Sequence, residues 1–274
     1  MALTKPSSDT DFPYWLVAAS AIAVFIAIVI VTNDLYSQVV VIVSRGVWIT
    51  IFVTLVGFAL ASALGLLIAV MGLSQSLVMR QVARFYVEII RGVPMLVLLF
   101  YIAFVGAPGF VVAWNFITTP LQEAGLLDEL KVRDISLMWR AIISLTIGYS
   151  AFIAEVFRAG ILAVDEGQIE AAQALGLSRW QRFRLIIMPQ ALRTILPPLG
   201  NDFVAMVKDS SLVSVLGVAD LTQMGKVYAS GSFRFFETYS IVAYIYLLLT
   251  VGLSLALRAL ERRLRQSGQN EQTG

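Results

Sequence analysis

Residues 165–184 read DEGQIEAAQALGLSRWQRFR, and this polar stretch between two apolar ones decides the fold of the chain. Residues 168–175 are mostly strong helix formers. Gly176 follows them at the position where a helix commonly ends in a left-handed residue. The stretch therefore predicts a short helix that ends at a glycine corner.

A second short helix is expected directly after the corner. Ser178 and Gln181 have the spacing of a capping box, which marks the first turn of a helix. Pro189 is expected to end this helix, because the residue before a proline is pushed towards an extended conformation. The result is a helix, a corner and a helix, in a connection of about twenty residues where a few would suffice. The alternative to a docking role is that this stretch is an ordinary capped connection between two membrane helices.

The rest of the chain has the composition of a membrane protein. Of its 274 residues, 58% are hydrophobic and 14% are charged. Soluble domains have about 45–50% apolar and about 25% charged residues, and a soluble fold of this composition would expose large apolar patches. The bilayer is therefore the expected solvent, and the fold class is an all-α membrane protein.

Several classes of site are excluded by composition. The chain has no Cys and no His, so disulfides, thiolate nucleophiles, cysteine-based zinc sites and catalytic histidines are absent. Its formal net charge is only +2, which is too balanced for a nucleic-acid-binding surface. We expect no catalytic residue and no metal site.

Apolar runs predict about six transmembrane helices, since a span needs roughly 20 apolar residues. We place them at residues 15–31, 47–72, 84–106, 139–164, 189–208 and 239–257, with an irregular excursion over 107–136 and disorder over 266–274. The first is expected to be a retained anchor, because residues 32–36 lack the small-residue pattern of a signal-peptide cleavage site. The fifth contains Pro197 and Pro198, so it should lie inside the bundle, where neighbours satisfy freed backbone groups.

Arginine and lysine in the connections set the expected orientation. Arginines stand between the second and third spans (Arg80 and Arg84), in the 165–188 connection and in the C-terminal tail, whereas the 107–136 excursion is acidic on balance. By the positive-inside rule, both termini and the 165–188 segment should be cytoplasmic.

The polar stretch carries a resemblance to a known family. Glu170-Ala171-Ala172, Gly176, Ile186 and Met188-Pro189 resemble, at the expected spacing, the EAA signature of ATP-binding-cassette (ABC) importer permeases. Met188 stands where Leu is usual, a nearly volume-conserving change. Five further motifs resemble the polar-amino-acid branch of that superfamily: residues 88–94, 154–158, 190–193, 199–201 and 208–212. The resemblance covers about residues 43–262.

The resemblance implies an architecture and a division of the chain. A five-helix permease core would occupy 41–262, with coupling helices at about 165–188. An extra helix would lie in 1–40, and 263–274 would form a cytoplasmic tail. The protein would sit in the bacterial cytoplasmic (inner) membrane.

The resemblance also implies partners. Such permeases pair as homo- or heterodimers, bind a cytoplasmic ABC ATPase dimer, and receive substrate from an extracytoplasmic amino-acid-binding protein. The partner ATPase would bind ATP and Mg²⁺, since this chain lacks the GxxxxGK[ST] loop that cradles phosphates. The residues expected to couple to the ATPase are Gln168, Glu170, Ala171, Ala172, Gly176 and Arg184.

Charged residues within the spans have two interpretations. Glu88/Arg91 and Glu155/Arg158 are spaced i, i+3, so each pair shares a helix face and could form a structural ion pair. Alternatively, charged and polar groups line a path for a zwitterionic amino acid. The candidate path residues are Asn201, Asp202, Lys208, Asp209, Ser210 and Ser211, followed by Glu88 and Glu155.

Two other functions compete with an importer permease for a polar amino acid. An ion- or proton-coupled secondary carrier could use Glu88, Glu155 and Asp202 as relay groups, and it would work without an ATPase. An intramembrane aspartyl protease would need two facing Asp residues, but only Asp202 lies in the middle of a predicted span.

Overall fold

The computed structural model describes residues 14–270, without the side chains of residue 15 and of 261–270. The described chain is all helices and connections, as predicted for an all-α membrane protein. Four helical stretches are long and apolar enough to cross a membrane: Asp34–Gly72, Met95–Glu123, Leu137–Leu162 and Phe235–Leu260, with a shorter one at Leu16–Thr32.

The core of the bundle is the contact between α3 (Val47–Gly72) and α7 (Leu137–Leu162). Gly65 permits this contact, because a Cβ there would lie 2.9 Å from Ile153 Cγ2 and 3.0 Å from Ser150 O. Val53 and Leu145 are fully buried beside it. α10 (Met188–Asp209) packs on the same pair.

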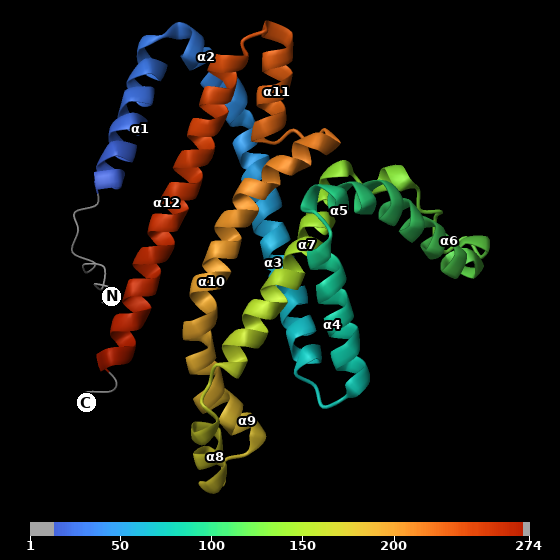
Figure 1. Cartoon of the computed structure of the whole chain (residues 1–274). Helices are drawn as coiled ribbons and strands as arrows, with labels where there is room; N and C mark the ends of the chain where they lie inside the picture. Colours follow the sequence, from blue (N-terminus) through green and yellow to red (C-terminus); the bar gives the residue numbers. More distant parts are fainter. Residues whose placement is uncertain (1–13, 271–274) are drawn as a thin grey trace, which may run out of the picture.

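The N-terminal helices lie against the C-terminal one. α1 (Tyr14–Thr32) runs beside α12 (Phe235–Asn270), and the Tyr244 hydroxyl donates to Ala23 O at 3.1 Å (Figure 1). α2 (Asp34–Val43) packs on α11 (Leu221–Ser232) and α12. α1 and α2 thus add to the edge of the bundle.

The span expected at 84–106 is wrong. α4 (Leu77–Gly92) ends where Val93 turns extended before Pro94, as sterics before a proline favour. A second helix then runs through α5 (Met95–Tyr101), a π-helical turn at Ile102–Gly106 and α6 (Ala107–Glu123). The excursion expected to be irregular over 107–136 is therefore helical to residue 123, and α6 projects sideways from the bundle (Figure 1).

The helix break expected at Pro189 is also wrong. α9 (Arg179–Arg182) continues through a π-helical turn at Phe183–Ile187 into α10. There the Met188 N–H donates to Phe183 O, five residues back. This wider turn gives the Pro189 ring room that a regular α-helix would deny it.

The two ends of the bundle differ in what they carry. The turn at 73–76, α8 (Glu166–Ala174), α9 and the C-terminal end of α12 lie at one end, whereas α2 and α11 lie at the other (Figure 1). α12 stays helical to Asn270, so the predicted disorder over 266–274 is wrong for its first five residues. Residues 1–13, the first part of the segment 1–40 that was predicted to hold an N-terminal tail and an extra helix, lie outside the described residues.

Candidate functional site

The glycine corner after α8 forms as the local sequence predicts. Gly176 has φ +79°, the left-handed region that glycine adopts at no steric cost. Its N–H donates to Gln173 O at 3.0 Å, and the Leu177 N–H donates to Ala172 O at 3.1 Å. These two hydrogen bonds make a Schellman motif, which satisfies carbonyls at the end of α8.

The helix after the corner has the predicted cap. Ser178 Oγ accepts from the Gln181 N–H at 3.3 Å, and Gln181 Oε1 accepts from the Ser178 N–H at 2.8 Å. This capping box fixes the direction in which α9 leaves the corner.

Side-chain hydrogen bonds join α8 to the helices that follow it. Arg182 Nη1 donates to Gln173 Oε1 at 2.8 Å, and Gln190 Nε2 donates to Gln168 Oε1 at 2.6 Å. Because α9 is continuous with α10, a force on α8 would be passed directly to a helix of the bundle. We call residues 165–184 the coupling module.

The outer surface of the coupling module is partly apolar. Of the residues predicted to couple, Ala172 is buried, and the others are exposed: Gln168, Glu170, Ala171, Gly176 and Arg184. Leu175 is 82% exposed and Trp180 67% exposed, and both lie within the same short segment. Exposed aromatic and aliphatic side chains of this kind are typical of a protein-docking surface. Sequence reasoning did not single them out, although both stand in the quoted stretch.

A first cavity, the acidic cavity, lies between α5, α7 and α10. It has a volume of about 260 Å³, and Tyr149, Asp202 and Asp209 line it with apolar residues. The Tyr149 hydroxyl donates to Asp209 Oδ2 at 2.8 Å across helices sixty positions apart in sequence. Two of the predicted path residues thus meet here, together with a tyrosine that sequence reasoning missed.

The other predicted path residues of this region are placed differently. Asn201 and Lys208 are exposed and do not line the acidic cavity. Ser210 is fully buried, and its hydroxyl donates to Val207 O at 2.7 Å. Ser211 is half-buried, and its carbonyl accepts from the Ser214 hydroxyl at 2.7 Å.

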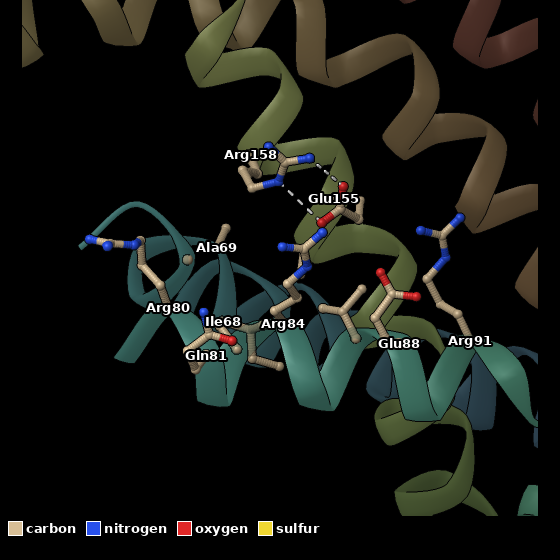
Figure 2. Close-up of a pocket in the computed structure, with 13 residues that line it drawn as sticks. Ile68, Ala69, Arg80, Gln81, Arg84, Glu88, Arg91, Glu155 and Arg158 are labelled. Atoms are coloured by element: carbon tan, nitrogen blue, oxygen red, sulfur yellow. Dashed lines mark hydrogen bonds and ion pairs between the residues drawn. The ribbon is translucent and has the colours of Figure 1, made fainter. Parts of the chain in front are cut away.

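A second cavity, the arginine cavity, lies between α3, α4 and α7 and has a volume of about 400 Å³. Its side chains rise from α4 towards the segment of α7 that carries Glu155 and Arg158 (Figure 2). The charged residues in its lining are Arg80, Arg84, Glu88, Arg91, Glu155 and Arg158.

One of the two predicted ion pairs forms. Arg158 donates to both carboxylate oxygens of Glu155, at 3.1 and 2.7 Å, from the next turn of α7 (Figure 2). Glu88 and Arg91 make no ion pair among the residues that the structure describes. Instead, the Arg91 guanidinium lies over the ring of Phe152, 5.4 Å from its centroid. Glu88 and Arg91 therefore share a face of α4, as predicted, but the expected contact between them does not form. The Arg91 guanidinium packs on the Phe152 ring of α7 instead.

The charges on α4 occupy one face of that helix. Arg80, Arg84 and Arg91 recur at helical spacing and line the cavity, while Val82 and Phe85 on another face are exposed. An ionised group facing lipid at the centre of a span costs about 2.5–3.5 kcal/mol on insertion scales. The polar face of α4 is therefore expected to meet water or protein, and its apolar face lipid or a neighbouring helix.

No cluster of three or more metal-ligating side chains occurs in the part of the chain that the structure describes. The site consists of the coupling module at one end of the bundle and the two cavities along α7.

Comparisons with known proteins agree with this geometry. Residues 61–266 match the family described as "Binding-protein-dependent transport system inner membrane component". The "Glutamine transport system permease protein" of Escherichia coli is 35% identical over 221 residues, which cover 81% of this chain and 92% of that protein. A "probable amino-acid permease protein" of Bacillus subtilis is 35% identical over 216 residues, 79% of this chain and 88% of that protein.

A solved structure extends the likeness to three dimensions. The crystal structure of an amino acid ABC transporter with histidines contains a chain that is 36% identical, with a TM-score of 0.68. The match covers 85% of this chain and 97% of that one. The chain described here is therefore a member of the family of inner membrane components of binding-protein-dependent transport systems.

Proposed function

We propose that this chain is the membrane-spanning permease subunit of an ATP-driven importer that carries a polar amino acid into the cell. Family membership supports the transport role, and the names of its relatives support the substrate class. No observation favours the ion-coupled carrier. The observation that carries the mechanism is the coupling module, with its exposed apolar side chains and its continuous connection to α10.

The proposed assembly contains three other kinds of protein. A dimer of cytoplasmic ABC ATPases binds ATP and Mg²⁺ and docks on the coupling module, so the chain itself is not an enzyme. A second permease subunit, identical or related, completes the path. An extracytoplasmic binding protein delivers the amino acid. The chain lies in the bacterial inner membrane, with both termini and the coupling module on the cytoplasmic side.

The proposed mechanism uses the coupling module as a lever. When ATP closes the ATPase dimer, the two coupling modules move together, and each tilts its α10. Gly176 holds the corner between α8 and α9, and Glu170 provides a polar contact to the ATPase. Tilting the helices turns the path from inward-open to outward-open, and hydrolysis with product release restores the inward-open state.

The proposed solute path includes the acidic cavity. Asp202 and Asp209 would receive the ammonium group of the amino acid there, since both carboxylates line the same space. Ser210 and Ser211 stabilise the turn after α10. The Ser210 hydroxyl donates to Val207 O, and the Ser211 carbonyl accepts from the Ser214 hydroxyl. Asn201 and Lys208 are exposed in this chain alone, so they would join the path only through the second subunit.

Co-purification tests the docking step. The tagged chain, expressed with the ATPase encoded beside it, should retain that ATPase in detergent, and Glu170→Arg should release it. Glu129→Arg is the matched control, because Glu129 is also exposed but lies in the connection after α6. Retention of the ATPase by Glu170→Arg, with normal solute uptake, would show that docking does not use the α8 surface.

A further inference from the structure

The acidic cavity and the arginine cavity are both lined in part by residues of α4 and α7. Phe152 lines the first and Arg91 lines the second, and these two side chains contact each other. Tyr149 lies about one turn from Phe152 on one side, and Glu155 about one turn on the other. The Arg91–Phe152 contact therefore lies where the lining of one cavity meets the lining of the other.

The two cavities have opposite charge. Asp202 and Asp209 are the charged residues that line the first. Four arginines and two glutamates line the second, which leaves an excess of two positive charges. A solute path through both cavities would therefore pass from an anionic region to a cationic one.

Two of the four arginines are available for a ligand. Arg158 is held by Glu155, and Arg80 donates to Ser74 O at 3.0 Å and to Gln75 O at 2.8 Å. No hydrogen bond or ion pair to Arg84 or Arg91 occurs among the residues that the structure describes; Arg91 has its ring contact and a longer-range electrostatic attraction to Glu155. In Figure 2, the Arg84 side chain extends from α4 towards the Glu155–Arg158 pair.

The depth of the arginines argues against a simple interfacial role. Arg80 and Arg91 lie about 16 Å apart along the axis of α4, since each residue of a helix adds about 1.5 Å. Arg80 lies at the end of the bundle that carries the coupling module, and Arg91 is one residue from the other end of α4. A lipid headgroup at the membrane surface would account for the first of these residues but not for the last. A route that a polar solute follows through the bundle accounts for both.

We propose that the arginine cavity is a carboxylate site on the inner half of the solute path, in which Arg84 and Arg91 bind the carboxylate of the amino acid as it leaves the acidic cavity. This proposal rests on the proposed function. Arginine suits this role because its planar guanidinium pairs with both oxygens of a carboxylate. A zwitterion can then move stepwise, its ammonium group held by Asp202 and Asp209 and its carboxylate received by Arg91 once that guanidinium leaves Phe152.

The test uses the complete transporter, the chain with its ATPase and binding protein, in proteoliposomes. A ¹⁴C-labelled mixture of the twenty L-amino acids identifies the transported solute, and initial uptake and ATP hydrolysis are measured together. We expect Arg84→Gln and Arg91→Gln to lower uptake at least tenfold, while ATP hydrolysis stimulated by the binding protein stays within twofold. Arg84→Lys and Arg91→Lys keep the charge but cannot pair with both carboxylate oxygens at once, so they should restore part of the uptake. Arg258→Gln removes an exposed arginine of α12 outside the cavity and should change neither quantity.

A chemical probe then asks whether a carboxylate occupies the cavity. In the nucleotide-free complex, the transported amino acid should protect Arg84 and Arg91 from phenylglyoxal, as measured by peptide mass spectrometry. Its decarboxylated amine should not protect them, and Arg258 should react equally in all samples. Each variant is compared with the wild type by thermal unfolding, and the lysine variants show whether any loss reflects charge or folding.

The outcomes separate the two proposals. If the wild-type transporter imports no labelled amino acid, the proposed function fails and the carboxylate site fails with it. If the wild type imports an amino acid, but both glutamine variants import it as fast and neither arginine is protected, only the carboxylate site is overturned. A joint loss of uptake and ATP hydrolysis in the glutamine variants, without rescue by lysine, would assign these arginines to packing alone and would also overturn it.

Discussion

Replacing Gly176 tests whether the corner between α8 and α9 transmits force. Gly176 has φ +79°, and a Cβ at this position would meet no atom within 4 Å. The cost of Gly176→Ala is therefore conformational rather than steric, about 1–2 kcal/mol for an L-residue in the left-handed region. A cost of that size raises the population in which the corner is open about 5- to 30-fold.

Amide hydrogen exchange measures this population directly. The Leu177 N–H, which donates to Ala172 O at 3.1 Å, should exchange about 5- to 30-fold faster in Gly176→Ala than in the wild type. Gly176→Asn should lie closer to the wild type, because Asn tolerates the left-handed region. Gly176→Pro should abolish coupled uptake, since proline fixes φ near −65° and cannot donate to Gln173 O.

The matched control is Gly231→Ala. A Cβ at Gly231 also meets no atom within 4 Å, but this glycine has no positive φ. Exchange at Leu177 and uptake should be unchanged in this variant. The reasoning is refuted if Gly176→Pro transports at the wild-type rate with normal stimulation of ATP hydrolysis, or if Gly176→Ala leaves exchange at Leu177 unaltered.

Three further perturbations test the bundle around the site. Gly65→Ala places a methyl group 2.9 Å from Ile153 Cγ2, so the free energy of unfolding in detergent should fall by about 1–3 kcal/mol; an unchanged unfolding midpoint would contradict the close α3–α7 contact. Tyr149→Phe removes the hydrogen bond to Asp209 and should raise the KM for uptake up to about tenfold with ATPase binding unchanged; an unaltered KM would place this pair outside the path. Burial raises the pKa of Asp220 to about 6, so the folded state binds a proton more tightly than the unfolded state does, and stability should rise as the pH falls from about 7 towards 4. Asp220→Asn should flatten that profile in thermal unfolding, and identical profiles for the two proteins would contradict the assignment.

Local signals in the sequence predicted the coupling module well. Gly176 and the Ser178–Gln181 capping box depend on neighbours within a few residues, and both formed as expected. The prediction failed at Pro189, because a π-helical turn accommodates the ring and the helix continues. Proline predicts a change in backbone geometry, but the surrounding packing decides whether that change is a break or a wider turn.

Contacts between distant segments were not predictable in the same way. Spacing placed Glu88 and Arg91 on one face of α4, but nothing in the sequence indicates that Phe152 of α7 lies under Arg91. The Tyr149–Asp209 hydrogen bond likewise joins two helices whose relative rotation depends on the whole bundle. Periodicity assigns a residue to a face, whereas the partner on the other side of that face is set by tertiary packing.

The extent of the third span shows a related limit. Residues 84–106 are apolar enough to read as one helix, but Pro94 forces Val93 into an extended conformation and divides it. The helix that follows continues through Pro108 to Glu123, because the π-helical turn at Ile102–Gly106 gives the proline ring room, as the turn before Pro189 does. Hydropathy measures whether a segment can lie in lipid, and it says little about where a helix bends.

Solute uptake by the reconstituted protein tests the central claim, that ATP hydrolysis in a partner drives transport through this chain. Proteoliposomes are prepared with the chain alone, with the chain and a hydrolysis-deficient ATPase, and with the chain and the active ATPase, each with binding protein and labelled amino acids. Accumulation against a gradient is expected only with the active ATPase and ATP. Accumulation driven by a proton or sodium gradient in vesicles that contain the chain alone would contradict the account.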